Sequence, residues 1–284
     1  MAVLELSNIA RQAGGRTILS DVSVQVDRGE FVSLVGPSGC GKSTLLYIVG
    51  GFTDYRDYQG EVRVDGVVSQ FPNWEKGIVF QKNVLYPWLN VLDNIAYGMV
   101  LRELTMTDPF LRRAHYLEKW REFRERAREY LLKMCMNEAD GAKMIYEISG
   151  GMQQRVDIAS ALMLRPKIMM MDEPFSGLDP QTRAVLQVLL RKAHREEGNT
   201  ILFVTHDLEE AVFLSTRVVV LSQFHNQGQG SRVVLDQPIP MHAAPDPRLE
   251  PGFQALVEKI RAAGFSREDQ KIMQAVAPGA KAHV

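Results

Sequence analysis

A glycine-rich loop carries the residues of this sequence that are best suited to chemistry. It matches the pattern G-x-x-x-x-G-K-[ST], whose backbone N–H groups surround phosphate oxygens. The glycines allow the tight turn, and the helix that follows adds partial positive charge. Lys42 is expected to reach the β- and γ-phosphates of a nucleotide, and the Ser43 hydroxyl to bind Mg²⁺. The predicted ATP-binding residues are Gly36, Pro37, Ser38, Gly39, Cys40, Gly41, Lys42, Ser43 and Thr44.

The segments on either side of this loop have the character that the motif requires. Residues 31–35 are predicted to form a short buried strand, and residues 45–49 the first turns of a helix. The alternative is a chance match, which occurs in roughly one per cent of chains of this length before context is considered. The strand–loop–helix context therefore favours phosphate binding.

The composition is that of an ordinary globular protein. Of 284 residues, 45% are hydrophobic and 24% charged, and the net charge of −1 gives no basic excess that would indicate nucleic-acid binding. Two cysteines, Cys40 and Cys135, do not favour a structural disulfide and fit a reducing compartment. No apolar run approaches about 20 residues, and the first residues lack a basic region. We expect no membrane span and no signal peptide, so a role at a membrane must come through a partner.

Strands and helices are predicted to alternate along the chain. Alternating or continuous apolar runs predict strands, and apolar residues at spacings of three and four predict helices. Strands are expected over 3–10, 18–26, 61–66, 77–80, 168–172, 200–206, 218–221 and 232–235, and helices over about 45–50, 91–144, 180–197 and 208–214, with short helices in the tail. This order predicts a mostly parallel α/β core.

The stretch from 91 to about 144 is the most charged of the predicted helical segments. Its apolar positions include Leu117, Trp120, Ala127 and Leu131, and basic side chains lie between them. A basic helix can bind membranes or nucleic acid. Here acidic residues are interleaved with the basic ones, which favours a solvated helix face.

Five further segments follow the loop in a characteristic order. Gln81 ends a strand, a Ser-Gly-Gly segment opens a helix, Asp172-Glu173 ends a buried strand, a Ser-Gly-Leu-Asp segment follows, and His206 ends another strand. Together with the loop they resemble the nucleotide-binding subunit of an ABC (ATP-binding cassette) transporter. The resemblance covers about residues 3 to 240. It implies a P-loop NTPase fold with a RecA-like mostly parallel core, an N-terminal antiparallel β subdomain and a helical subdomain.

The resemblance gives catalytic roles to four residues outside the loop. Asp172 is expected to hold Mg²⁺ through water, because Mg²⁺ prefers octahedral oxygen ligands. Glu173 is placed to polarise the attacking water as a general base. His206 is expected to bridge the γ-phosphate and this water, and Gln81 to contact Mg²⁺ or water. The alternatives are that the two acids only cap a helix and that the histidine is structural.

The same family pairs two cassettes face to face. The helix opened by the Ser-Gly-Gly segment has an anion site at its start, which in the family faces the ATP bound to the other subunit. The expected contacts in trans are Ser149, Gly150, Gly151 and Met152, called here the signature segment, and the expected interface segment after Asp172-Glu173 is Ser176, Gly177, Leu178 and Asp179, called here the D-loop. The resemblance thus implies a homodimer. Bound ATP would favour its closed state, and hydrolysis would favour its open state.

Three features depart from the family pattern. Ile148 and Met152 stand where leucine and glutamine are usual. No aromatic residue stands near Ala13, where the family places a ring on adenine, although Arg11 offers a planar group that can stack on a base. The helical segment between Gln81 and Ser149 is longer than usual, with the extra part expected near 104–120.

Further segments resemble those of bacterial importers. Residues 81–98 and 205–211 look most like the nitrate/sulfonate/taurine importer group. This implies a membrane permease and a periplasmic solute-binding protein as partners, and a location at the cytoplasmic face of the inner membrane. A non-transport ABC ATPase, a cassette with a dead site, and an exporter or lipid-trafficking ATPase remain alternatives. The expected domains are a cassette over 3–240, with its helical subdomain at about 88–163, and a tail over 241–284.

Overall fold

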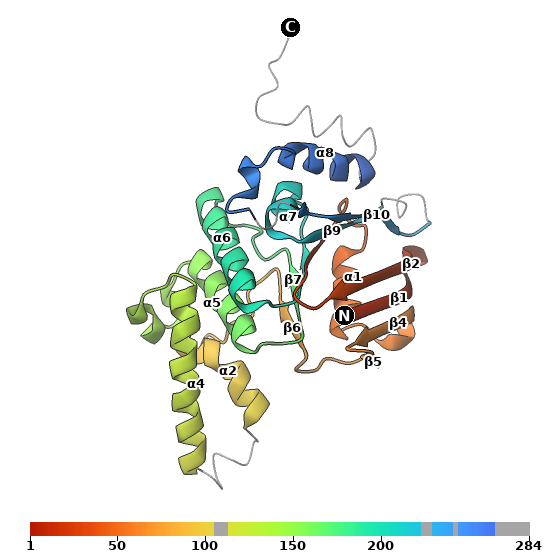
Figure 1. The fold of residues 1–284 in the computed structure, drawn as a ribbon. Coiled ribbons are helices and arrows are strands. Elements are labelled where there is room, and N and C mark those ends of the chain that lie inside the picture. The colour runs from red at the N-terminus through yellow and green to blue at the C-terminus, as the bar shows by residue number, and fades with distance from the viewer. Residues whose placement is uncertain (105–112, 223–228, 241–243, 265–284) are drawn as a thin grey trace. The chain divides into compact units, whose positions relative to one another are not determined.

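The computed structural model describes residues 1–104, 113–222, 229–240 and 244–264 (Figure 1). These residues form two compact units. The first consists of Met1–Phe71 together with the described part of Leu202–Val284, and the second of Pro72–Ile201.

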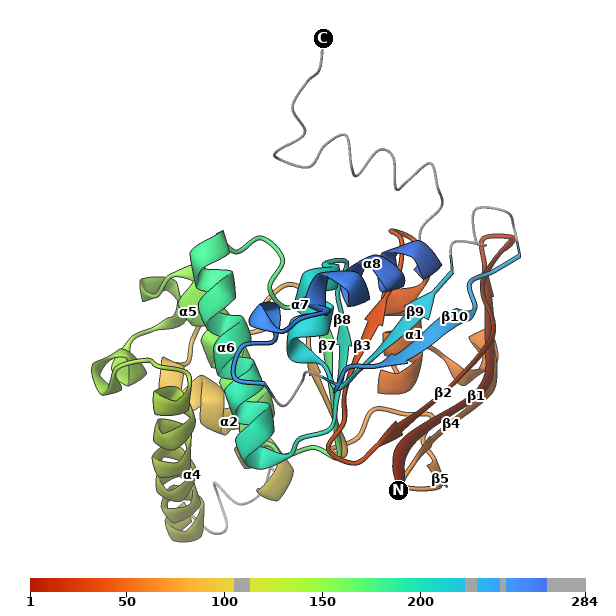
Figure 2. The same ribbon diagram turned by 45° about the horizontal axis from the view of Figure 1, so that its top comes forward.

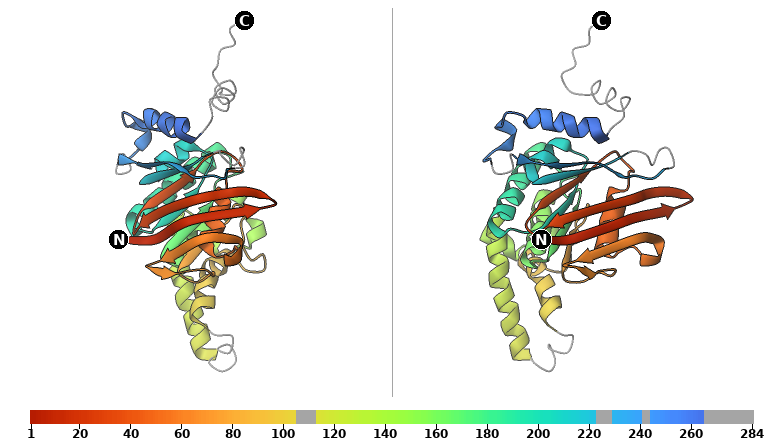
Figure 3. Two further views of the ribbon diagram at one scale, coloured as in Figure 1. Left: turned by 90° about the vertical axis from the view of Figure 1, so that its right-hand side faces the viewer. Right: turned by 45° about the vertical axis from the view of Figure 1, so that its right-hand side comes forward.

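An antiparallel sheet forms one layer of the first unit (Figure 3). Its strand order is β2-β1-β4-β5, and the short turn between β1 and β2 contains Gly14 and Gly15, both with positive φ. From Val22 to Asp27 of β2, buried and exposed residues alternate, as the alternating sequence predicts. The strands span β1 Ala2–Ala13, β2 Arg16–Asp27, β4 Tyr58–Val64 and β5 Val67–Val68, so both predicted N-terminal strands are confirmed and are longer than expected.

A second sheet of the first unit contains the strand that leads into the glycine-rich loop. Its hydrogen-bonded order is β10-β9-β3-β8, in which β3 and β9 are parallel and β10 is an antiparallel edge strand. The strands span β3 Phe31–Val35, β8 Ile201–Val204, β9 Arg217–Leu221 and β10 Val233–Pro238. All residues of β3 and β8 are buried, which is typical of strands covered on both faces.

Three helices belong to the described part of the first unit. They are α1 Lys42–Gly50, α7 Leu208–Leu214 and α8 Phe253–Gly264. In α8, Phe253, Val257 and Ile260 recur at helical spacing and are buried, and the helix lies against α7, β9 and β10 (Figure 2). The predicted short helix in the tail is therefore confirmed, and its apolar face stabilises the edge of the sheet.

The described part of the second unit combines a parallel strand pair with four helices. Strands β6 Lys76–Val79 and β7 Ile168–Asp172 run parallel. The helices are α2 Val91–Glu103, α4 Arg113–Lys133, α5 Gly150–Met163 and α6 Pro180–Glu197, and α2, α4 and α5 pack against one another (Figure 1). Short 3₁₀ turns in the two units cover 55–57, 138–142, 145–147 and 247–249.

The helical stretch differs in detail from its prediction. It contains two helices in its described part, α2 and α4, rather than one continuous helix. Ala127 and Leu131 are buried on α4 as expected, but Leu117 is 47% exposed. Arg124 donates two hydrogen bonds to the carboxylate of Asp93, at 2.5 and 2.6 Å, and so joins α4 to α2. Part of the predicted extra segment, residues 105–112, lies outside the described residues.

These sheets and helices agree with the predicted α/β fold class. Among the residues that the structure describes, no helix is long and apolar enough to cross a membrane. The expected domain boundaries stay predictions.

Candidate functional site

The glycine-rich loop joins β3 to α1 with a backbone that requires glycine. Gly36, Gly39 and Gly41 all have positive φ, at 153°, 78° and 94°. A Cβ added to Gly36 would lie 2.7 Å from the carbonyl oxygen of Leu221, and one added to Gly41 would lie 2.8 Å from Cδ2 of Leu19. Larger residues at these two positions would therefore push the loop away from its neighbours.

Lys42 is held across the loop. Its ammonium group donates to the carbonyl oxygens of Gly36 at 2.9 Å and Pro37 at 3.0 Å, and its side chain is buried. The cation is therefore fixed beside the backbone groups that the motif assigns to phosphate. Cys40 is also buried, and burial raises the pKa of its thiol, so it is a packing residue of the loop.

His206 follows the strand beside β3. The N–H of Thr205, one residue before it, donates to the carbonyl oxygen of Leu34 near the end of β3, at 3.4 Å. The His206 side chain is exposed. The structure thus brings His206 and the loop to the ends of neighbouring strands in the first unit.

A hydrogen-bond network that the sequence reasoning did not identify fixes the backbone around His206. The Thr205 hydroxyl donates to the Glu210 carboxylate at 2.6 Å and accepts from the Asp207 N–H at 3.0 Å. Asp207 caps α7 by accepting from the Glu210 N–H. The D-x-x-E spacing of Asp207 and Glu210 before an apolar run is a capping signal that could have revealed this network.

The parallel register of β6 and β7 places Gln81 and the two acidic residues in the second unit. Val79 pairs with Met171, so Gln81 and Glu173 each lie two residues beyond a matched pair, at the same edge. Asp172, the last residue of β7, is buried, and Glu173 is half-buried. The register therefore places an amide and two carboxyl groups at the same edge of this strand pair.

Glu173 has an unusual backbone. Its φ is 45°, in the left-handed region that residues other than glycine rarely adopt. The N–H of Ser176 donates to its carbonyl oxygen at 3.0 Å, which fixes the turn that follows the strand. Strained backbone of this kind is often found at functional sites, where the surrounding structure maintains it.

The signature segment forms the start of α5. The Ser149 hydroxyl accepts a hydrogen bond from the Met152 N–H at 3.3 Å and caps the helix. Ser149 and Gly150 are exposed, whereas Ile148 is buried. Ile148, which replaces the usual leucine, therefore packs in the core. Ser149 and Gly150 at the helix N-terminus remain accessible.

The first turn of α6, which follows the D-loop, lies against the signature segment within the second unit. A Cβ added to Gly151 would lie 2.5 Å from Cγ2 of Thr182, in the first turn of α6. Asp179 caps α6 by accepting from the N–H groups of Gln181 and Thr182, and these hydrogen bonds lower its pKa. The carboxylate of Asp179 thus has a structural role as a cap within its own chain.

Comparisons with known proteins decide the family. The model of the ABC transporter family matches residues 19–176. The chain is also 39% identical over 220 residues to the taurine import ATP-binding protein TauB of Escherichia coli (strain K12), over 78% of this chain and 80% of that protein. The chain belongs to the ABC transporter family. TauB of Shigella sonnei (strain Ss046) shows the same identity and coverage.

Solved structures agree with this assignment. A dimeric post-hydrolysis state of the ATP-binding cassette MJ0796 bound to ADP and Pi has a TM-score of 0.65 and 29% identity, over 83% of this chain and 98% of that one. A dimeric structure of MJ0796, described as a bacterial ABC transporter cassette, has a TM-score of 0.66 and 30% identity. The predicted family and fold are confirmed, and as an ABC transporter ATPase the chain binds ATP and hydrolyses it to power transport.

Proposed function

We propose that this chain is the ATPase subunit of a bacterial importer, in which two copies hydrolyse ATP at their shared interface to drive a small polar solute through a separate permease. One observation carries the proposal. The register of β6 and β7 puts Gln81 level with Glu173, beside the buried Asp172, in a chain that is 39% identical to taurine import ATP-binding proteins. An amide and two carboxyl groups are the side chains needed to activate water for ATP hydrolysis.

The loop residues bind the triphosphate in this proposal. Lys42 supplies a positive charge beside the β- and γ-phosphates, and the N–H groups from Gly39 to Thr44 supply donors. The hydrogen bonds of Lys42 to Gly36 and Pro37 support this role, because they hold the ammonium group within the loop before nucleotide arrives. Such preorganisation reduces the cost of binding.

The oxygen donors present suit Mg²⁺. The Ser43 hydroxyl follows Lys42 in the first turn of α1, and Asp172 presents a carboxylate at the end of β7. Mg²⁺ prefers such oxygen ligands together with water and substrate phosphates. When bound, Mg²⁺ would neutralise charge on the transferred phosphoryl group.

Glu173 is the general base in this proposal. Its carboxylate accepts a proton as the water oxygen bonds to the γ-phosphorus, while the bond from that phosphorus to the bridging oxygen of ADP breaks. His206 orients the water and the γ-phosphate, and Gln81 contacts the water or Mg²⁺. The network of Thr205, Asp207 and Glu210 supports the role of His206 by fixing its backbone.

The second copy completes each site. The exposed N-terminus of α5, formed by Ser149, Gly150 and Gly151, offers N–H groups and partial positive charge to the ATP bound by the other copy. Met152 follows in the same turn, and the D-loop lies beside it at the interface. The dimeric state of the related MJ0796 cassettes supports this pairing.

The solute is proposed to be a small organic sulfonate of the taurine type. Support comes from the relatives, which are named as taurine import proteins. The remaining partners are a periplasmic solute-binding protein and the permease, which would hold the chain at the cytoplasmic face of the inner membrane.

Hydrolysis and uptake can be tested with one variant. Glu173→Gln is expected to slow ATP turnover by about 10²–10⁴-fold while ATP binding persists, because only the base is lost. Taurine uptake by cells that lack the native subunit should be restored by the wild-type chain and not by this variant. Glu118→Gln, an exposed position on α4, is the matched control. Near-normal turnover of Glu173→Gln would overturn the assignment of Glu173 as the general base. Wild-type ATPase activity without taurine uptake would overturn the proposal that the solute is taurine-like.

A further inference from the structure

The start of α5 carries two side chains that donate hydrogen bonds to backbone carbonyl groups outside the helix. They belong to Gln153 and Arg155, which follow the signature segment directly and are both half-buried. Neither residue belongs to the phosphate-binding loop, to the strand ends that hold the acidic residues, or to the signature segment itself. Their acceptors lie in two other pieces of chain that meet the start of α5.

The side-chain amide of Gln153 folds back onto the turn that leads into the signature segment. Its Nε2 atom donates to the carbonyl oxygen of Ile145 at 3.0 Å and to that of Ile148 at 3.4 Å. An amide nitrogen carries two hydrogens, so it can make both bonds at once. The backbone N–H of Gln153 also donates to the carbonyl oxygen of Ser149, at 2.9 Å. One residue therefore fixes the angle at which the chain enters the helix.

The turn that receives these bonds is itself anchored. Residues 145–147 form a 3₁₀ turn, and the N–H of Met144 donates to the carboxylate of Glu147 at 2.6 Å. The N–H of Val91, at the start of α2, donates to the carbonyl oxygen of Lys143 at 2.9 Å. The two isoleucines that bear the acceptor carbonyls are buried. The amide is therefore bonded to backbone that is already fixed, and the start of α5 is held against it.

Arg155 joins the same helix start to the end of α4. Its Nη1 atom donates to the carbonyl oxygens of Met134 at 3.2 Å and Cys135 at 3.0 Å. The last carbonyl groups of a helix have no partner within it, and a basic side chain that donates to them caps the helix. Cys135 has a φ of 52°, in the left-handed region that often ends a helix. One guanidinium thus holds the end of α4 and the start of α5 together.

These contacts determine the direction in which the signature segment points. Ser149 and Gly150 are exposed, so burial does not fix them, and the Ser149 hydroxyl bonds only to the next turn of its own helix. A group that binds a ligand must be held to within about 0.5 Å of its productive position. The bonds of Gln153 and Arg155 to the surrounding backbone meet this requirement from two sides of the helix start.

We propose that Gln153 and Arg155 are positioning residues, which hold the signature segment in the orientation that contacts the ATP bound by the second copy. The inference rests on the proposed function, because that function brings the ATP of the other copy to the signature segment. Neither side chain contacts the nucleotide, and each acts through the backbone at the start of α5. Loss of either should weaken the closed dimer and leave nucleotide binding by the loop intact.

ATP-dependent dimerisation of the Glu173→Gln chain measures this contact, because ATP persists in that background. Light scattering over a range of protein concentrations gives the dimer dissociation constant, and ATP affinity is measured at a concentration at which the chain is monomeric. Gln153→Met and Arg155→Met, which lack the donors, should each raise the dimer dissociation constant by at least about fivefold, since every dimer loses the bonds twice. The ATP affinity of the monomer should not change. Gln25→Met, on the exposed face of β2, is the matched control and should alter neither quantity.

Unchanged dimerisation in Gln153→Met or in Arg155→Met would overturn the inference for that residue. Equal losses of ATP affinity in the monomer and of dimerisation would assign the residue to folding, and would overturn the inference as well. Gln153→Asn keeps the amide but is one methylene shorter, so it should reproduce the loss of dimerisation even if Gln153→Met unfolds. Ser149→Arg tests the proposed function separately. If dimerisation persists with this large side chain, the signature segment does not contact ATP in trans, and the proposed pairing fails whatever the other variants show.

Discussion

Gly151 of the signature segment and Thr182 of α6 are in such close contact that a Cβ on the glycine would lie 2.5 Å from the threonine Cγ2. The start of α5 and the first turn after the D-loop are therefore packed without room for a side chain. The signature segment and the helix that follows the D-loop are therefore packed directly against each other.

Gly151→Ala is expected to disturb this contact and lower stability by about 1–3 kcal/mol, the usual cost of overpacking. Gly150→Ala is the matched control, since a Cβ there meets nothing within 4 Å, and helix propensity favours alanine. The double variant Gly151→Ala/Thr182→Ser removes Cγ2 and should recover most of the loss. Chemical denaturation measures the free energy of unfolding of all three variants. Equal stability of the two glycine variants would contradict the packing argument.

The two cysteines are expected to react very differently with thiol reagents. Cys40 is buried in the loop and burial raises its pKa, whereas Cys135 is exposed. A bulky maleimide should therefore modify Cys135 in the native protein and Cys40 only after unfolding. Mass spectrometry of the labelled peptides measures both. Rapid native labelling of Cys40 would show that the loop opens readily, and ATP should then slow it.

Much of the fold could be predicted because local signals agreed with the tertiary structure. Helix α6 has the predicted bounds, since Asp179 caps it, Pro180 occupies its first turn, and Gly198 ends it with φ of 65°. The run Ile168–Asp172 is a buried strand because no polar residue interrupts it before the acid. Elements whose ends are marked by capping or turn residues, and whose apolar residues follow a clear pattern, were thus predicted well.

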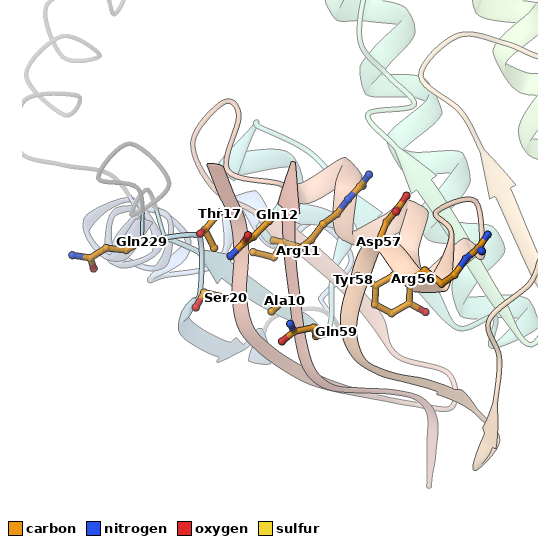
Figure 4. A pocket seen from close by; sticks show the side chains of 11 residues that line it. Ala10, Arg11, Gln12, Thr17, Ser20, Arg56, Asp57, Tyr58, Gln59 and Gln229 are labelled. Atoms are coloured by element: carbon orange, nitrogen blue, oxygen red, sulfur yellow. The ribbon is translucent and has the colours of Figure 1, made fainter. Parts of the chain in front are cut away.

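The features that were predicted wrongly or not at all have a different physical origin. Leu117 fits the helical period but is 47% exposed, because a helical period alone does not show which part of the marked face another element covers. The pairing of Arg11 with Tyr58, which both line one pocket of the first unit (Figure 4), depends on the register between β1 and β4, which contains a shift between Ser7 and Ala10. A bulge of this kind changes which residues face each other, and no local pattern revealed it. This pairing therefore could not be inferred from sequence, although Arg11 could be named as a candidate for stacking on a base.

The buried carboxyl group of Asp157 predicts a pH dependence of stability. Asp157 lies on α5, and burial raises its pKa from 3.8 to about 7. The native state therefore retains a proton that the unfolded chain has lost between these two values. Because stability falls wherever the native state binds more protons, the contribution of this group decreases as pH rises from about 4 to about 7 and is constant above that.

Asp157→Asn removes this titration and keeps a side chain of similar size. The free energy of unfolding of the wild type, measured by urea denaturation, should fall relative to that of the variant between pH 5 and pH 8, by more than about 1 kcal/mol. Asp246→Asn is a suitable control, because Asp246 caps a surface 3₁₀ turn and shows no such burial. A wild-type minus Asp157→Asn difference that stays constant across this range would show that Asp157 is already ionised in the folded protein at pH 5.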